Sequence, residues 1–204
     1  MVFGIDFDNT IVSYHGLFYA TARCLNWMPE QQDQSKNAVK NFFVSRNLEP
    51  KWTELQGKVY GEAIKDATPY DGVKDMISIL CSRGIKVHII SHKTQYPVIG
   101  DKLDFHKAAE AWLEKNGIFE LGIPQSNVHF NSTKELKIRM IRDLNCQVFI
   151  DDLPSILHHE EFPPKTKKIL FDPYAANTEN REFLSMTHWS ELEGLLLDAR
   201  KYRH

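Results

Sequence analysis

The sequence lacks the features that would mark several specialised classes of protein. Its 204 residues include only three cysteines, Cys24, Cys81 and Cys146, which are widely separated and form no CxxC pair. An odd number of cysteines at such spacings argues against a disulfide framework and against a structural zinc site. Internal repeats and low-complexity tracts are absent, and with 42% hydrophobic and 25% charged residues the composition excludes a disordered or fibrous chain.

An excess of positive charge and a long apolar run are absent as well. The formal net charge is -2, which gives no indication of a nucleic-acid partner. No apolar segment approaches the ~20 residues that a membrane-spanning helix needs, and no cationic leader precedes an apolar run at the N-terminus. We therefore expect a cytoplasmic protein in a reducing compartment, with no membrane partner.

What the sequence does contain is an alternation of short apolar runs with helix-like segments. Most of the runs lack the polar alternation of half-exposed strands, as expected of strands that are covered on both faces. They lie at residues 2–5, 86–91, 127–130, 147–150 and 167–171. Strands separated by helices predict an α/β fold, a Rossmann-like doubly wound sheet of five parallel strands with helices on both faces.

Three amphipathic segments between these runs predict helices. They cover residues 70–84, 102–117 and 132–145, and each places apolar residues along one face. The first two end at Gly84 and Gly117, and glycine favours the left-handed conformation that commonly follows a helix.

Residues 13–68 interrupt the alternation, because they contain no convincing strand. Three helical patterns lie within them, at about 16–26, 36–46 and 52–66. A structureless loop of this length would be unusual in a compact domain, so the stretch predicts a small helical cap inserted after the first strand. We therefore divide the chain into a core domain, residues 1–12 and 69–204, and a cap insertion, residues 13–68.

Polar and charged side chains gather at the carboxyl ends of the first, second and fourth predicted strands. They are Asp6, Asp8 and Thr10 at the first, Ser91, His92 and Lys93 at the second, and Asp151 and Asp152 at the fourth. The helix before the fourth strand begins near two lysines, Lys134 and Lys137. Because ligands of open parallel sheets bind beyond the carboxyl ends of the strands, we expect these groups to meet in one cavity.

The four carboxylates at this rim call for a cation, because their mutual repulsion would otherwise be strongly destabilising. Oxygen ligands favour a hard ion, and few fixed carboxylates with room for water suit Mg²⁺ better than Ca²⁺. A metal ion with a lysine and a hydroxyl beside it suits a ligand with several anionic oxygens, and phosphate is the natural candidate. We therefore expect a small-molecule phosphate ester as the substrate.

The spacing of Asp6 and Asp8 is compatible with two different roles in phosphate chemistry. A carboxylate can attack phosphorus and form an aspartyl-phosphate, which would make Asp6 the nucleophile. Asp8 would protonate the leaving oxygen and then activate water. The pattern predicts a Mg²⁺-dependent phosphohydrolase that cleaves a phosphomonoester.

These motifs resemble those of the haloacid dehalogenase (HAD) superfamily of phosphatases. The resemblance rests on DFDNT at residues 6–10, Ser91 at a strand end, a helix-borne lysine and DD at residues 151–152, in this order. It covers the sheet-forming parts of the chain, and the insertion at residues 13–68 is placed like the small helical cap of that superfamily. The resemblance implies a HAD-like core fold.

The resemblance also implies a role for each matched residue. Asp6 would be the nucleophile and a Mg²⁺ ligand, and Asp8 would be the general acid and base whose backbone carbonyl also binds the metal. Ser91 would hydrogen-bond the phosphoryl oxygens. Asp151 would complete the protein part of the metal shell, with Asp152 beside it.

The sequence departs from the superfamily pattern directly after the second strand. Many relatives have Asn or Gly after the Ser or Thr, whereas SHKT places His92 and Lys93 there. His92 and Lys93 could therefore reach either the substrate or the cap, and we assign them, together with Thr10, to substrate binding.

Two lysines compete for the role of the catalytic lysine. Lys134 and Lys137 precede the apolar residues of the same predicted helix at similar offsets, so either could face the site. We favour Lys137, because T-x-E-x-K-I at residues 133–138 resembles related members more closely, and Lys134 stays open as the alternative.

Two other functions are compatible with the same residues. A phosphotransferase or phosphomutase of the same superfamily needs the same groups and differs in the acceptor. A non-catalytic phosphate-sensing or phosphate-binding module is the other alternative, although the acidic pair of a receiver domain normally comes at the first strand as adjacent residues. The sequence gives no indication of the oligomeric state.

Overall fold

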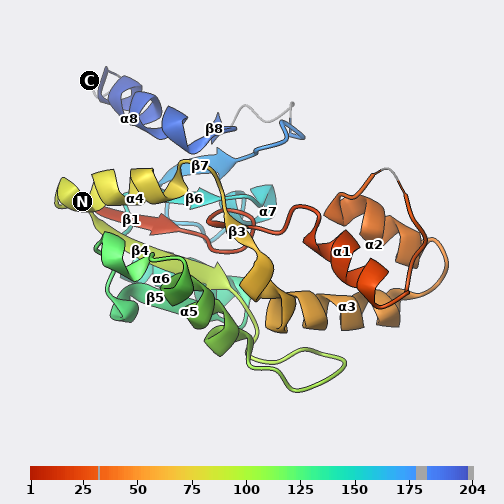
Figure 1. Ribbon diagram of the computed structural model, residues 1–204. Coiled ribbons are helices and arrows are strands. Elements are labelled where there is room, and N and C mark those ends of the chain that lie inside the picture. Colours follow the sequence, from red (N-terminus) through yellow and green to blue (C-terminus); the bar gives the residue numbers. More distant parts are fainter. Residues whose placement is uncertain (32, 178–182, 202–204) are drawn as a thin grey trace. The chain divides into compact units, whose positions relative to one another are not determined.

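The computed structural model of the chain describes residues 1–31, 33–177 and 183–201 (Figure 1). It divides into two compact units. The first unit contains Met1–Val12, Pro69–His92 and Gly117–His204, and the second contains Ser13–Thr68 and Lys93–Asn116. The chain passes between the units four times, and two of these passages lie within the short strands β2 (Val12–Ser13) and β3 (Thr68–Pro69), which pair with each other.

The first unit is built on a parallel sheet, which has six strands within the described residues. In chain order these are β1 (Val2–Ile5), β4 (Lys86–His92), β5 (Val128–Asn131), β6 (Val148–Asp151), β7 (Lys167–Phe171) and β8 (Leu184–Met186). Their order across the sheet is β5-β4-β1-β6-β7-β8 (Figure 1). The strand order therefore reverses direction between β1 and β6, and such a switch point is where open parallel sheets bind ligands.

The predicted α/β class and the parallel sheet are confirmed, but the predicted number of strands is wrong. The five expected strands form at their predicted positions within one residue at each end. The sixth, β8, pairs in parallel with β7 at the edge of the sheet. Its sequence is only LSM and two of its three residues are exposed, so it carries no apolar run that could have signalled it.

Helices cover both faces of this sheet. They are α4 (Val73–Ser82), α6 (Lys134–Asp143), α7 (Pro154–Leu157) and α8 (Leu192–Lys201), with short 3₁₀ turns at Phe119–Leu121, Gln125–Asn127 and Trp189–Glu191. Ile90, Phe149 and Leu170 share one buried cluster with apolar residues of α6 and α7. Because side chains alternate along a strand, the intervening buried residues Ile89 and Ile150 face the opposite layer.

Gly4 in the middle of β1 allows the sheet to pack tightly at this point. A Cβ atom added at Gly4 would lie 2.5 Å from Cδ2 of Phe149, closer than two carbon atoms can approach. Phe149 is fully buried on the neighbouring strand β6. The ring therefore occupies the space that a side chain at Gly4 would need, in the strand that leads directly to Asp6.

The second unit is a small helical body. Its helices are α1 (Leu17–Cys24), α2 (Lys36–Val44), α3 (Glu49–Gly61) and α5 (Phe105–Lys115), with a 3₁₀ turn at Ala63–Asp66. Five aromatic rings form its centre through a series of stacked and edge-to-face contacts, from Tyr14, Phe18, Trp52, Tyr60 and Phe105. Aromatic rings bury a large apolar area each, which compensates for the small size of this unit.

The contents of the second unit differ from the predicted cap at one point. The unit includes Lys93–Asn116, which the sequence-based division left in the core domain. Helix α5 is joined to the rest of the unit by the Trp112 indole, which donates to the backbone carbonyl of Ala67 at 2.9 Å. The apolar periodicity of α5 shows that it is a helix, but it does not indicate which body the helix packs against.

Within the described ranges, no helix has both the length and the apolar character that crossing a membrane requires.

A pair of histidines connects β4 with β5, the strand at the edge of the sheet. Nδ1 of His88 lies 3.0 Å from Nε2 of His129, and the two rings stack at a centroid distance of 5.2 Å. Burial, His129 and the nearby Lys86 ammonium together lower the pKa of His88 to about 4. Burial and Lys86 also lower the pKa of His129. The folded protein therefore keeps this pair neutral where an unfolded chain would begin to protonate it.

We expect the free energy of unfolding to fall as the pH is lowered from about 6.5 toward about 4, because the unfolded state then binds protons that the folded pair rejects. The loss should be at most about 3 kcal/mol. Urea denaturation at pH 7 and pH 5 measures it in an Asp6→Asn background, because ordinary carboxylates titrate little in this window whereas the pKa of Asp6 is raised to about 7. In the double variant His88→Gln/His129→Gln this component should disappear, and an unchanged pH dependence would contradict the assignment.

Candidate functional site

The tips of β1 and β6 place two carboxylates side by side at the switch point of the sheet. The backbone amide of Asp6 donates to the carbonyl of Ile150 at 2.9 Å, which continues the pairing of these strands to their ends. Asp6 follows the last residue of β1, and Asp151 is the last residue of β6. Both side chains are buried, with exposed fractions of 4% and 0%.

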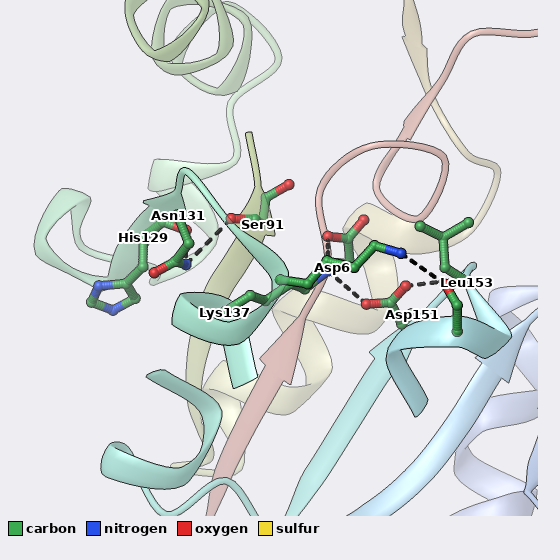
Figure 2. Close-up of polar contacts among 9 residues, drawn as sticks. Asp6, Ser91, His129, Asn131, Lys137, Asp151 and Leu153 are labelled. Atoms are coloured by element: carbon green, nitrogen blue, oxygen red, sulfur yellow. Dashed lines mark hydrogen bonds and ion pairs between the residues drawn. The ribbon is translucent and has the colours of Figure 1, made fainter. Parts of the chain in front are cut away.

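Lys137 of α6 lies between these two carboxylates. Its Nζ atom is 2.5 Å from Oδ1 of Asp6 and 2.6 Å from Oδ2 of Asp151, and Lys137 itself is only 1% exposed. Figure 2 shows the three side chains meeting from two strand tips and one helix. The other oxygen of Asp151, Oδ1, accepts from the backbone amide of Leu153 at 2.9 Å, which fixes the carboxylate in place.

Burial and the close contact change the pKa values of two of these groups, Asp6 and Lys137. Burial raises the pKa of Asp6 to about 7, opposed by Lys137 and reinforced by the carboxylates of Asp151 and Asp8. Burial by itself would lower the pKa of Lys137, but Asp151 and Asp6 together raise it above its ordinary value. Lys137 is therefore a permanent cation, whereas full ionisation of Asp6 at neutral pH requires more positive charge than Lys137 supplies.

The loop after β1 is a tight turn that holds Asp8 and Thr10. The carbonyl of Phe7 accepts from the backbone amides of Ile11 and Val12, both at 3.0 Å. Asn9 has a φ of 58°, in the left-handed region that asparagine tolerates better than most residues. The turn keeps Asp8 next to Asp6, close enough for its charge to act on the Asp6 carboxyl.

Two buried hydroxyl groups at the same rim make no hydrogen bond within the part of the chain that the structure describes. They belong to Thr10 in the loop after β1 and to Ser91 near the end of β4, with exposed fractions of 0% and 1%. A buried hydroxyl without a partner costs free energy and is rare in proteins. Such groups at a strand-end site are suited to hydrogen-bonding a polar ligand.

The carboxylates at this rim fit a hard divalent metal ion. Oxygens of Asp6, Asp151 and Asp152 lie within 4.8 Å of one another. Three carboxylates with one neighbouring ammonium leave a net negative charge, and an all-oxygen donor set is the kind that Mg²⁺ prefers. Burial is the main cause of the raised pKa of Asp6, and the nearby carboxylates of Asp151 and Asp8 raise it further, so a bound cation would lower it again.

The structure separates the two candidate lysines. Lys137 makes both buried ion pairs. Lys134, at the partly exposed start of α6, instead has its Nζ atom 3.3 Å from the hydroxyl of Ser155. Thr133 is the N-cap of this helix and accepts from the amide of Leu136 at 3.2 Å. Lys134 is thus in the first helical turn, and Lys137 lies one turn deeper at the strand tips.

The two remaining predicted residues follow Ser91 along the chain. His92 is exposed at the end of β4, and its Nε2 lies 3.2 Å from the carbonyl oxygen of Ser132. Lys93 is the first residue of the second unit's later segment and is only 5% exposed. Its ammonium lies 4.8 Å from the centre of the Tyr60 ring, also in the second unit.

The sequence reasoning missed one residue at this rim. Asn131, the last residue of β5, is buried, and its side-chain amide donates to the carbonyls of Ser91 and His129, both at 3.3 Å (Figure 2). The predicted strand ended at Phe130, so Asn131 follows it just as Asp6 and Asp151 follow theirs. The rule that selected the other residues, a polar side chain at the carboxyl end of a parallel strand, would have found Asn131.

Similarity in sequence does not place the chain in a known group, because no protein-family profile and no curated protein matches it. Solved structures do match it over nearly its whole length. A HAD-family hydrolase from Deinococcus radiodurans R1 with bound phosphate and sodium has a TM-score of 0.64 at 14% identity, covering 98% of this chain and 96% of that one.

Two further structures give similar values. A HAD-type hydrolase from Bacillus subtilis bound to magnesium has a TM-score of 0.62 at 13% identity, covering 96% of this chain and 97% of that one. A phosphoserine phosphohydrolase-like protein from Francisella tularensis has a TM-score of 0.59 at 14% identity, covering 95% and 98%. The fold of the chain is therefore shared with these hydrolases.

Replacing Lys137 by methionine should destabilise the protein strongly, because it leaves Asp6 and Asp151 buried without their shared cation. We expect the free energy of unfolding to fall by about 3–5 kcal/mol. Urea denaturation in the presence of a chelator measures it. Lys134→Met is the matched control and should change stability by less than about 0.5 kcal/mol; equal losses in the two variants would contradict the central place given to Lys137.

Proposed function

We propose that this chain, whose fold is that of the haloacid dehalogenase (HAD) superfamily hydrolases, is a Mg²⁺-dependent phosphohydrolase that cleaves a small-molecule phosphomonoester. The observation that carries the proposal is the buried contact of Lys137 with Asp6 and Asp151 at the switch point of the sheet. It supports a site where the Asp6 carboxylate is held in position next to the fixed positive charge of Lys137. Transfer of an anionic phosphoryl group requires such an arrangement.

Asp6 is the nucleophile in this proposal. One of its carboxylate oxygens attacks phosphorus, the bond from phosphorus to the ester oxygen breaks, and an aspartyl-phosphate forms on Asp6. Asp8, in the tight turn two residues on, gives its proton to the leaving oxygen. Asp8 then removes a proton from a water molecule, which attacks phosphorus, releases inorganic phosphate and restores the Asp6 carboxylate.

The remaining residues bind and orient the phosphoryl group. The buried hydroxyls of Thr10 and Ser91 make no hydrogen bond among the described residues, so each is available to donate to a phosphoryl oxygen. Lys137 keeps the Asp6 carboxylate oriented through its 2.5 Å contact. His92 and Lys93, which directly follow Ser91, bind the substrate outside its phosphoryl group.

Mg²⁺ is the cofactor in this proposal. Asp6, Asp151 and Asp152 would hold it through carboxylate oxygens, and Asp8 would add its backbone carbonyl. When bound, the ion supplies positive charge that keeps Asp6 ionised and offsets the charge of the phosphoryl oxygens. The protein's part is to fix the carboxylates, as Asp151 is fixed by Lys137 and the Leu153 amide.

The structural neighbours agree with the ligands that this proposal requires. The Deinococcus radiodurans protein is described with bound phosphate, and the Bacillus subtilis protein with bound magnesium. The Francisella tularensis protein is described as phosphoserine phosphohydrolase-like. A metal ion and a phosphate are therefore compatible with this fold, and the residues at the strand tips of this chain are chemically suited to both.

Asp6→Asn should abolish the release of phosphate from an aryl phosphate, because an amide is too weak a nucleophile to attack phosphorus. We expect a loss of at least about 10³-fold in kcat with the fold retained. Phosphate release in the presence of Mg²⁺ and circular dichroism are the measurements. Asp143→Asn, at the exposed end of α6, is the matched control and should keep full activity; turnover by Asp6→Asn would disprove the nucleophile.

Mg²⁺ should stabilise the protein, because it binds the folded carboxylate cluster and not the unfolded chain. At a concentration about 100 times its Kd the gain is about 2.7 kcal/mol, seen as a rise in Tm. Asp152→Asn should reduce this rise, while Asp143→Asn should leave it unchanged. A chelator should remove phosphatase activity in parallel. A Tm that does not respond to Mg²⁺ would exclude this metal site.

A further inference from the structure

Two asparagines at the two ends of β5 make the same kind of bridge to β4, one just before the strand and one at its last residue. Asn127 precedes β5, and its side-chain amide donates to the carbonyl of Val87 at 3.0 Å. Asn131 ends β5, and its amide donates to the carbonyl of Ser91 at 3.3 Å. Both side chains are buried. The two bridges are alike in chemistry but differ in what they hold, since only the second reaches the rim with Asp6 and Ser91.

Ser91 is the group whose position matters at that rim. Its hydroxyl is buried and makes no hydrogen bond among the described residues, so no side-chain contact orients it from within the protein. Its direction therefore depends on how firmly the backbone of residue 91 is held. The pairing of β4 with β5 ends at His92 and Asn131, so the backbone of residue 91 lies one pair before the end of the ladder, close to where strands fray most easily.

Asn131 holds the backbone of residue 91 through a pair of hydrogen bonds from one side-chain amide. The same amide nitrogen donates to the carbonyl of Ser91 and to the carbonyl of His129, each at 3.3 Å, and so ties the end of β4 to the end of β5. Both partners are carbonyl oxygens, which only accept, so the side chain must present its N–H groups toward them. A carboxylate or an apolar side chain of similar size could not make this contact.

The segment after Asn131 extends the connection toward Lys137. The carbonyl of Ser132 meets Nε2 of His92 at 3.2 Å, which is a second link between the same two strand ends. Thr133 then caps α6, the helix that carries Lys137. Residues 131–133 thus join the backbone of Ser91 to the start of the helix whose lysine holds Asp6 and Asp151.

We propose that Asn131 is a positioning residue, which holds the backbone of Ser91 so that its hydroxyl is oriented toward the phosphoryl group. The proposal rests on the function proposed above, because it assigns Ser91 a phosphoryl oxygen to bind. Asn131 does not itself touch the substrate in this scheme. It acts through Ser91, so its removal should weaken the binding of the phosphoryl group by the Ser91 hydroxyl.

The test compares Asn131→Ala with Asn127→Ala, which removes a matched amide-to-carbonyl bridge between the same strands far from the rim. The two variants should lose similar stability in urea denaturation. Binding of inorganic phosphate in the presence of Mg²⁺, measured by calorimetry, should weaken by about tenfold in Asn131→Ala only. Should Asn131→Ala not fold, Asn131→Leu, which has a similar size but neither N–H groups nor a charge, takes its place.

A double-mutant cycle shows whether Asn131 acts through Ser91. In a Ser91→Ala background, adding Asn131→Ala should weaken phosphate binding no further. A further tenfold loss of phosphate affinity in the Ser91→Ala background would overturn the positioning role and leave the proposed function intact. Equal phosphate affinity in Asn131→Ala and Asn127→Ala would do the same. A wild-type protein that binds no phosphate in the presence of Mg²⁺ would overturn the proposed function, and with it this inference.

Discussion

The buried contact of Lys137 with Asp6 and Asp151 is the interaction on which the rest of the site depends. An isolated charge in a protein interior costs several kcal/mol, so these three side chains can be buried only together. The contact fixes the tips of β1 and β6 and the start of α6 relative to one another. It also leaves one more carboxylate than ammonium, and Asp152 adds another nearby, so the arrangement attracts a further cation. The same carboxylates, Asp6 and Asp151, thus form the ion pairs with Lys137 and part of the candidate metal site.

Several groups at this rim are held in states that a ligand would relieve. The pKa of Asp6 is raised mainly by burial, and the hydroxyls of Thr10 and Ser91 are buried without a hydrogen bond among the described residues. Each of these features costs stability in the free protein. Groups of this kind cluster at functional sites, because the free energy lost in folding is recovered when substrate or metal binds. Their coincidence at one switch point is stronger evidence for a site than any of them singly.

Much of the core fold and the site could be predicted from the sequence, because the deciding features are local. Apolar runs mark the buried strands, and the position of Asp6 and Asp151 directly after such runs places them on one edge. What failed depends on contacts distant in sequence. Strand β8 is held by pairing and not by its own composition, and α5 is amphipathic whichever body it packs against. Lys134 and Lys137 are three residues apart, about 4.5 Å of rise and slightly less than one helical turn, and only the position of α6 beside the strand tips separates them.

The central claim is that the phosphoryl group passes to an oxygen of the protein before it passes to water. The stereochemical course at phosphorus tests this most directly, with a phosphate ester made chiral by oxygen isotopes. Each in-line displacement inverts the configuration, so two successive displacements through an aspartyl-phosphate should give inorganic phosphate with overall retention. Inversion would mean that water attacks the ester directly, and it would contradict the account.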